Sequence, residues 1–331
     1  MFTPRLSGPR VLAVGGSIAL AIILLYYSLR GIEWRTVALL LERVRLFWVV
    51  LYCFGCSAAL FLRACRWRIL LRAAGEVSVS AAFQATAAGY FGNIFLPARA
   101  GEVVRTVMIS SRTGLNKAYV LTTALSERMA DAITLVVVSS AILLTLPAQA
   151  GWLANAAKPF AAVGTAGVLA IAILPWLEPA IHRLIAACPI PAGVSKKISD
   201  LTGHIVSGIR SFHEPKRIAG FLSLTCVIWC IDAVGAIFIA HALGLAMNIA
   251  LAFLLIAGLG LGSALPSTPG YVGIYQFVAV KILTPAVSKT DAIAYILLFQ
   301  AANYIAITTW GLIGLWAHRQ SEPLASVPAA T

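Results

Sequence analysis

The sequence predicts an all-α fold, a polytopic bundle of helices embedded in a membrane. Three observations support this class. The 331 residues are 60% hydrophobic and only 11% charged, whereas about a quarter of the residues in a soluble domain are charged. The mean hydropathy is +0.90. Seven long runs are almost free of charge, and several reach the roughly 20 residues that a helix needs to cross a bilayer. These runs cover residues 11–29, 46–62, 132–146, 159–177, 218–243, 249–265 and 292–317.

The first run is expected to be retained as a helix whose amino end lies in the cytoplasm. It follows Arg5 and Arg10, as in a secretory signal, but residues 26–31 contain no small-x-small cleavage pattern. If each long run crosses once, most basic residues fall on the cytoplasmic side, among them Arg63 and Arg66 just after the second run. We therefore expect a multi-pass protein of the bacterial inner membrane.

Two segments between the runs are expected to lie on the membrane surface. Over residues 33–45, charged and apolar residues alternate with a helical period, which favours an amphipathic helix. Over residues 178–217 a similar spacing, beside Lys196 and Lys197, predicts an amphipathic loop facing the cytoplasm. Residues 319–331 form a Pro-, Ala- and Ser-containing tail that we expect to be flexible.

Two segments rich in proline and glycine indicate an internal repeat. Both contain the pattern Leu-Pro-x-x-x-Gly, and Pro266 follows Pro97 by 169 residues. The same offset carries the apolar segments 47–66 and 120–146 onto two further apolar segments. A motif and its flanking spans at one offset predict a duplication within a single transmembrane domain of residues 1–331. The predicted halves cover residues 10–146 and 159–317.

The repeat predicts the topology of the bundle. With three full crossings in each half, the second half enters from the opposite face, which gives an inverted repeat of the kind found in many transporters. Proline and glycine free backbone groups that lipid cannot satisfy, so the two motifs are expected to form re-entrant hairpins buried in protein or facing a wet cavity. This gives six full spans and two broken hairpins. The alternative is a tight loop between two full spans in each half, which gives eight spans.

The first hairpin carries charges that lipid does not tolerate. Arg99, Glu102 and Arg105 follow the proline at three-residue steps, on one side of a helix that should begin near Ala100. The two arginines would suit a phosphate group, with Glu102 orienting one guanidinium. The alternative is a solvated cytoplasmic loop.

The helix after the first hairpin carries three more charged residues, Glu127, Arg128 and Asp131. Ionised groups at this depth require partners, so we expect Arg128 to pair with Asp131 and Glu127 to pair with Arg99 or Arg105. The cluster is then a headgroup or proton site, or else a purely structural set of ion pairs. Asp232, in a later apolar run, has no evident partner in the sequence.

The second hairpin supplies neutral polar groups where the first supplies charges, and a cavity with these two ends suits an amphiphile. We predict that a lipid headgroup contacts residues of the first hairpin and of the helix after it. These are Asn93, Pro97, Arg99, Gly101, Glu102, Arg105, Glu127, Arg128 and Asp131. The residues predicted from the second hairpin are Pro266, Ser267, Thr268, Pro269, Gly270, Gly273 and Gln276.

The composition also argues against several other classes of protein. The formal charge of +13 comes from basic residues in loops between apolar runs, which indicates anionic lipid headgroups as partners and not nucleic acid. The cysteines and histidines show no metal spacing, so neither a metal nor a cofactor is expected. The sequence lacks a nucleophile elbow, a His-Glu-x-x-His motif and a P-loop, which disfavours an enzyme.

Four ordered motifs resemble those of the lysylphosphatidylglycerol synthase transmembrane, or flippase-like, family. The first two are Arg-x-x-Arg-Trp-x-x-Leu-Leu over residues 63–71 and Gly-Asn-Ile-Phe-Leu-Pro-Ala-Arg-Ala-Gly-Glu-Val-Val-Arg over residues 92–105. The other two are Glu-Arg-Met-Ala-Asp over 127–131 and Pro-Ser-Thr-Pro-Gly-Tyr-Val-Gly over 266–273. The resemblance covers residues 10–318.

This resemblance implies a lipid-translocating module, found alone or fused to an aminoacyl transferase domain as in the multiple peptide resistance factor. Related members are linked to hopanoid or isoprenoid-glycolipid pathways. Only a short tail follows Arg319, so the aminoacyl transferase activity is not expected. The family often has a glutamate where this chain has Gln276, so a charge-dependent role there is not carried over.

The expected function is therefore a flippase-like transporter that moves an anionic lipid, or an isoprenoid- or hopanoid-type lipid, between leaflets. Two alternatives remain open. One is a membrane-embedded lipid synthase or transferase. The other is a partner of lipid biosynthetic enzymes that does not itself transport lipid.

Overall fold

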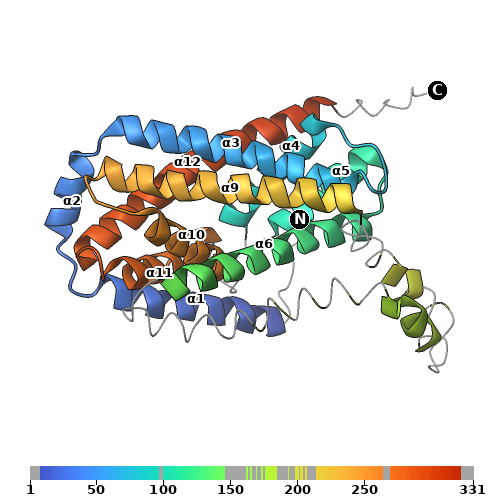
Figure 1. Ribbon diagram of the computed structural model, residues 1–331, viewed down its shortest axis with the longest axis horizontal. Coiled ribbons are helices and arrows are strands. Elements are labelled where there is room, and N and C mark those ends of the chain that lie inside the picture. The colour runs from blue at the N-terminus through green and yellow to red at the C-terminus, as the bar shows by residue number, and fades with distance from the viewer. Residues whose placement is uncertain are drawn as a thin grey trace.

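A computed structural model of the protein gives a bundle of helices (Figure 1). It describes residues 8–96, 100–145, 214–263 and 269–321, together with residues 176–184, 198–200 and 202–203 and positions 162, 165, 169, 173, 193 and 206. These parts of the chain contain helices and no strand, which confirms the all-α class. The principal helices in the first half are α1 (Gly8–Leu29), α2 (Trp34–Glu42), α3 (Leu46–Leu71), α4 (Val79–Phe95), α5 (Gly101–Thr113) and α6 (Lys117–Thr145). Those in the second half are α9 (Pro215–Ala242), α10 (Ile249–Ser263), the 3₁₀ turn η2 (Pro269–Tyr271), α11 (Ile274–Leu283) and α12 (Lys289–Ser321).

Three of the described helices are long and apolar enough to cross a membrane, namely α3, α9 and α12. The predicted spans at 46–62, 218–243 and 292–317 lie within them. Helix α6 has 29 residues but carries three charged residues in its middle part, and the apolar helices α10 and α11 are shorter. The predicted run at 159–177 lies largely outside the described residues. A multi-pass membrane protein is thus confirmed, and the number of spans stays a prediction.

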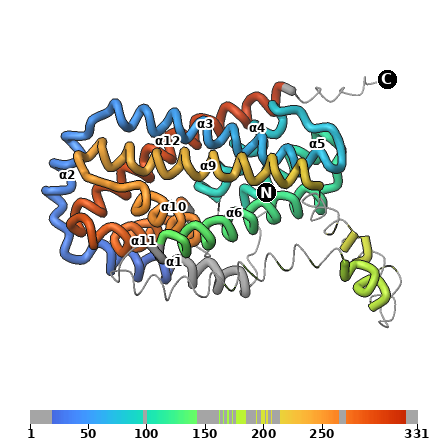
Figure 2. Tube along the Cα trace, viewed as in Figure 1, coloured from blue at the N-terminus to red at the C-terminus, as the bar shows by residue number. Residues whose placement is uncertain are grey.

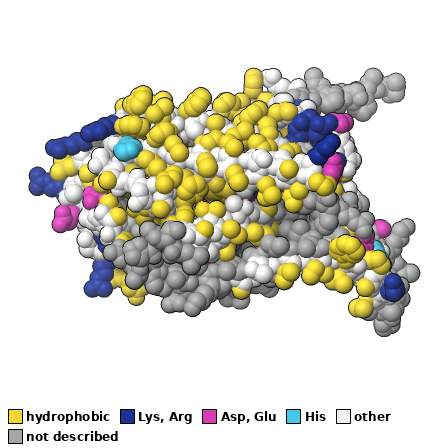
Figure 3. Space-filling model, viewed as in Figure 1, with side chains coloured by type: hydrophobic (Ala, Val, Ile, Leu, Met, Phe, Trp, Pro, Cys, Tyr) yellow, Lys and Arg dark blue, Asp and Glu magenta, His cyan; other side chains and the backbone are white. Residues whose placement is uncertain are grey.

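The exposed surface of the bundle has the distribution of side chains that a bilayer requires. Hydrophobic side chains cover the middle of the visible face, while Lys and Arg side chains gather towards the two ends (Figure 3). On α3, Phe47, Phe54 and Phe61 are all exposed. Large apolar side chains are stable on the outside of a helix bundle when lipid covers them.

One expectation about helix ends was wrong. We expected Arg63 and Arg66 to lie in a cytoplasmic loop after the apolar run at 46–62, but α3 continues to Leu71 and includes both arginines. The physical reason is that the acidic groups of α6 and α9 pair with them inside the bundle, so their charges do not end the helix. The sequence pattern does not show these partners.

The two proline- and glycine-rich segments separate pairs of short helices. Helices α4 and α5 lie at one end of the bundle, and α10 and α11 lie towards the other (Figures 1 and 2). Glycines allow each pair to pack closely. A Cβ atom on Gly101 would lie 1.8 Å from the backbone oxygen of Gly89 in α4, and one on Gly258 of α10 would lie 2.5 Å from Ile282 of α11.

Helices in the two halves correspond in order and in spacing. Adding 169 to the first residue numbers of α3, α4, α5 and α6 gives positions within four residues of the starts of α9, α10, α11 and α12. Helices α3 and α9 pack along each other and run in opposite directions, as the colours in Figure 1 show. Helix α4 packs on α12, and its counterpart α10 packs on α6. One large cluster of buried apolar side chains lies in the first half, and another lies mainly in the second half but includes Val37 and Tyr52.

The predicted surface segments are described only in part. A helix does form at 34–42, where it lies across one end of the bundle and buries Val37 against the core (Figure 1). Most of the predicted cytoplasmic loop at 178–217 lies outside the described residues. Residues 319–321 of the predicted flexible tail continue helix α12, and the rest of that tail also lies outside the described residues.

Candidate functional site

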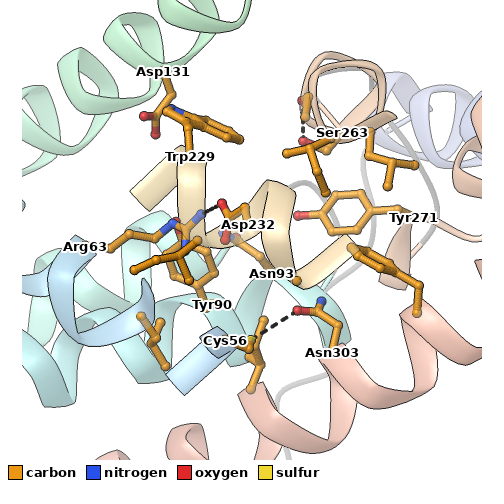
Figure 4. A pocket seen from close by; sticks show the side chains of 18 of the residues that line it. Cys56, Arg63, Tyr90, Asn93, Asp131, Trp229, Asp232, Ser263, Tyr271 and Asn303 are labelled. Atoms are coloured by element: carbon orange, nitrogen blue, oxygen red, sulfur yellow. Dashed lines mark hydrogen bonds and ion pairs between the residues drawn. The ribbon is translucent and has the colours of Figure 1, made fainter. Parts of the chain in front are cut away.

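A cavity of about 190 Å³, lined by both polar and apolar side chains, lies between the two hairpins (Figure 4). Helices α3, α4, α6, α9, α10, α11 and α12 contribute side chains to its wall, together with the 3₁₀ turn η2. Its polar and aromatic lining residues are Tyr52, Cys56, Arg63, Tyr90, Asn93, Arg128, Asp131, Trp229, Asp232, Ser263, Tyr271, Tyr275, Phe299 and Asn303. A cavity lined by ionised groups inside an apolar bundle is costly and indicates a functional site.

An ion pair in the wall of this cavity joins helices α3 and α9. Arg63 of α3 pairs with Asp232 of α9, the acid for which the sequence showed no partner, and the two side chains point towards each other in Figure 4. The two residues are 169 apart, which is the offset of the predicted repeat. They meet because α3 and α9 are antiparallel neighbours. Arg63 also lies over the ring of Tyr90, with its guanidinium carbon 5.8 Å from the ring centre.

Arg66 lies one helical turn from Arg63 and is completely buried. Its guanidinium donates to both carboxylate oxygens of Asp131, at 2.6 and 2.8 Å, and to Glu127 at 2.9 Å. It also donates to the hydroxyl of Thr225 on α9 at 3.0 Å. This planar, many-donor arrangement explains why an arginine stands at this position.

Arg105 of α5 belongs to the same network of ion pairs. It pairs with Glu127 at 2.9 Å and with Glu102 at 2.6 Å, and it donates to the backbone oxygen of Ala124 at 3.2 Å. Its guanidinium carbon lies 4.5 Å from the ring centre of Trp67. The predicted contact between Glu127 and Arg105 is confirmed, but the arginine is 1% exposed and does not line the cavity.

Arg128 of α6 pairs differently from our expectation. Its Nε donates to Glu102 at 2.9 Å, and its Nη1 donates to the hydroxyl of Tyr90 at 2.9 Å. The expected pair between Arg128 and Asp131 was wrong because Asp131 faces Arg66 across the helix interface. Arg128 and Asp131 both line the cavity.

Asn93 joins the hairpin to this network. Its side-chain oxygen accepts from the backbone N–H of Gly101 at 3.0 Å, and its amide nitrogen lies 3.4 Å from Glu102 as a donor. A Cβ atom on Gly101 would lie 2.5 Å from the Asn93 oxygen, so both residues are needed for the close approach of α4 and α5. The predicted site residues Pro97 and Arg99 lie outside the described residues.

The network carries no net charge. Four arginines, two on α3 and one each on α5 and α6, are balanced by four carboxylates. These are Arg63, Arg66, Arg105 and Arg128, with Glu102, Glu127, Asp131 and Asp232. Neutrality and multiple hydrogen bonds are the conditions under which charges are stable in a low-dielectric interior.

The second hairpin is held by neutral hydrogen bonds. Gln276 accepts from the backbone N–H of Gly273 at 2.7 Å and donates to Gln300 of α12. Gln300 donates to the backbone oxygen of Gly270 at 3.1 Å and to the hydroxyl of Tyr304 at 3.0 Å. The structure thus brings three predicted residues together, at positions 270, 273 and 276. Pro269 begins η2, and Pro266, Ser267 and Thr268 lie outside the described residues.

Among the residues of the second hairpin that the structure describes, three have positive φ. Gly270 has φ of 72° and Gly273 has φ of 90°, which favours glycine at both positions. Tyr271 has φ of 59°, which is uncommon for a bulky side chain and often marks a functional site. Its ring stacks on that of Tyr275, with centres 5.0 Å apart, and both tyrosines line the cavity.

Sequence reasoning missed several residues of the site. The arginines of α3 were counted among loop charges, and Tyr90, Thr225 and Gln300 were not identified. The spacing of Arg63 and Arg66, two basic residues three apart beside an apolar run, was the signal available in the sequence. Nothing in the sequence pattern indicates which acids they contact.

Comparisons with known proteins agree with the motifs. A family model described as lysylphosphatidylglycerol synthase TM region matches residues 14–311. A curated protein named glycosyltransferase AglD, from Haloferax volcanii, is 27% identical over 271 residues, which is 70% of this chain and 43% of that protein. The chain therefore spans less than half the length of this relative. No solved structure matches the chain.

Proposed function

The chain belongs to the lysylphosphatidylglycerol synthase TM region family, and from this premise we propose that it moves lipid across the membrane. In this proposal the polar headgroup passes through the cavity between the two hairpins while the acyl or isoprenoid chains stay in lipid. The cavity itself is the observation that carries the proposal. It places ionised and hydrogen-bonding groups in the interior of an apolar bundle, where a polar headgroup would otherwise have no partners.

The arrangement of the helices supports transport by alternating access. We propose that residues 46–145 and 215–321 are the two halves of an inverted repeat, since α3 and α9 are antiparallel and each hairpin packs on the last long helix of the other half. Inverted repeats allow a transporter to open to either side by exchanging the conformations of its halves. The ion pair between Arg63 and Asp232 joins the halves at the cavity.

We propose that the bundle lies in the cytoplasmic membrane of a bacterium with its amino terminus inside. The end of the bundle where α3 ends and α9 begins carries Arg68, Arg72, Lys216 and Arg217. Basic residues next to spans favour the cytoplasmic side. The other end also carries basic residues around α2, but Glu33 and Glu42 partly balance them.

The test is lipid exchange in liposomes that contain the purified protein. Traces of anionic phospholipid, glycolipid and hopanoid analogues, each with the same fluorophore on its apolar part, are quenched from outside with dithionite. Protein-dependent exchange of at least one lipid is expected. The variant Arg128→Gln, in the cavity wall, should slow it about tenfold, whereas Glu76→Gln, at an exposed surface pair, should not.

A membrane-embedded lipid synthase or transferase is the main competing function, because one relative is named a glycosyltransferase. A new covalent lipid product, formed by the purified protein from lipid and a sugar donor, would favour it. No exchange and no product from folded protein would instead indicate a partner in a lipid biosynthetic complex.

A further inference from the structure

We propose that the cavity accepts lipid headgroups without net charge and rejects anionic ones. This inference rests on the proposed function, in that the headgroup is taken to enter this cavity. It narrows the substrate to headgroups that are uncharged or zwitterionic and that carry oxygen atoms able to accept hydrogen bonds.

The first step of the argument is the charge of the cavity wall. Arg63 and Arg128 contribute two positive charges, and Asp131 and Asp232 contribute two negative charges. Each of the four already has an opposite charge as its partner: Arg63 and Asp232 pair with each other, Arg128 pairs with Glu102, and Asp131 pairs with Arg66. No net positive charge therefore remains among the described residues of the cavity wall to attract an anion.

The second step is the consequence for an entering headgroup. An anion bound to Arg63 would bring a second negative charge next to Asp232, and displacing Asp232 would leave that carboxylate without its partner. Removing one member of a buried ion pair is strongly unfavourable, because the charge of the other member is left without a partner. An uncharged headgroup leaves the pair intact. A zwitterionic headgroup opens the pair but supplies one charge of each sign, so every ion keeps a partner.

The third step concerns the neutral groups in the wall. The indole N–H of Trp229 is buried and has no hydrogen-bond acceptor among the described residues. Trp229 lines the cavity (Figure 4), so a turn of its ring towards the cavity would bring this donor to an oxygen of the headgroup. On the side of the second hairpin, Tyr271 extends into the same cavity, and Asn303 contacts the Cys56 thiol there. Such a lining recognises hydroxyl or ester oxygens and does not require a charge.

The first experiment compares three lipids in the same liposomes. Glucosyl diacylglycerol is uncharged, phosphatidylethanolamine is zwitterionic and phosphatidylglycerol is anionic, and all three carry the same fluorophore on an acyl chain. The expected result is exchange of phosphatidylglycerol about tenfold slower than that of the faster of the other two. Exchange of phosphatidylglycerol at an equal or higher rate would overturn the inference.

A binding measurement separates this inference from the proposed function. Each unlabelled lipid is added to the protein in detergent, and the shift in the thermal unfolding midpoint is measured. Stabilisation by the uncharged or zwitterionic lipid above that by phosphatidylglycerol supports the inference even if no lipid is transported, in which case only the transport function fails. Greatest stabilisation by phosphatidylglycerol, or none by any lipid, would overturn the inference.

Variants of the ion pair provide the second experiment. Asp232→Asn leaves Arg63 without its carboxylate, so exchange of phosphatidylglycerol relative to the uncharged lipid should rise about tenfold. The double variant Arg63→Gln/Asp232→Asn removes both charges and should restore the rejection of the anion. Glu76→Gln, in an exposed pair with Arg72, is the matched control and should keep the native ratio. An unchanged ratio in folded Asp232→Asn protein would contradict the proposal.

Discussion

At the scale of single residues, the stability of the charged network depends most on Arg66. Its side chain has no exposed surface, and it bonds two carboxylates of α6 and a hydroxyl of α9 at once. The neighbouring exposed arginine, Arg72, pairs only with Glu76 on the protein surface. Arg66 in α3 and Arg72 just after its end thus offer a direct comparison between a buried and an exposed ion pair.

Arg66→Met is expected to destabilise the protein by about 3–5 kcal/mol, because Glu127 and Asp131 would lose the guanidinium that both contact. Thermal unfolding in detergent, followed by the fraction of monodisperse protein, measures the loss. Arg72→Met removes an exposed pair and should change the stability by less than about 1 kcal/mol. Equal losses of stability in the two variants would show that the buried network contributes no more to stability than the exposed pair does.

At the scale of the elements, each hairpin depends on a close approach between two helices. In the first hairpin, Gly101 packs against the backbone of Gly89 and against the side chain of Asn93. This contact sets the position of the first turn of α5, and with it the position of Glu102. The charged network and the hairpin backbone are therefore one structural unit.

Gly101→Ala is expected to prevent this packing, since its Cβ would lie 1.8 Å from the Gly89 oxygen. We expect a loss of at least about 3 kcal/mol or failure to accumulate folded protein, because backbone atoms must move. Gly220→Ala in α9 is the control, because its Cβ would meet Ile69 at 3.5 Å, an ordinary contact. The yield of monodisperse protein and its unfolding midpoint are the measurements. A Gly101→Ala protein with a native midpoint would contradict the described hairpin geometry.

At the scale of the whole molecule, the antiparallel course of α3 and α9 determines which loops share a side. Glu33 precedes α2 at one end of α3, and Glu76 follows the other end of α3. Both side chains are exposed. If α3 spans the membrane, these two positions lie on opposite sides, and the proposed orientation places Glu76 in the cytoplasm.

Single cysteines at these two positions test the topology in a chain whose six native cysteines are replaced by serine or alanine. A membrane-impermeant maleimide applied to intact cells should label the Glu33→Cys protein and not the Glu76→Cys protein. Labelling of both after permeabilisation serves as the control for reactivity. Labelling of both positions in intact cells would contradict the span, and the reverse pattern would overturn the orientation.

Much of the fold was predictable because it depends on local properties of the chain. The lengths of the apolar runs anticipated the spanning helices α3, α9 and α12, and the spacing after the first proline motif anticipated a helix that begins near residue 100. A contact of Glu127 with Arg99 or Arg105 was predicted because a buried acid requires a basic partner, and the structure shows the contact with Arg105. Arg66 was missed because hydropathy ended the second run before it, although the helix continues when its charge finds partners.

The sequence by itself determined the helical class, the membrane environment and the family, because composition, hydropathy and ordered motifs are properties of segments read one at a time. Only the tertiary structure decided which charges meet. Arg63 and Asp232 are 169 residues apart, and they form a pair because two helices from different halves pack antiparallel. The electroneutrality of the cavity follows from such pairings, and pairings between distant helices depend on packing that no local pattern encodes.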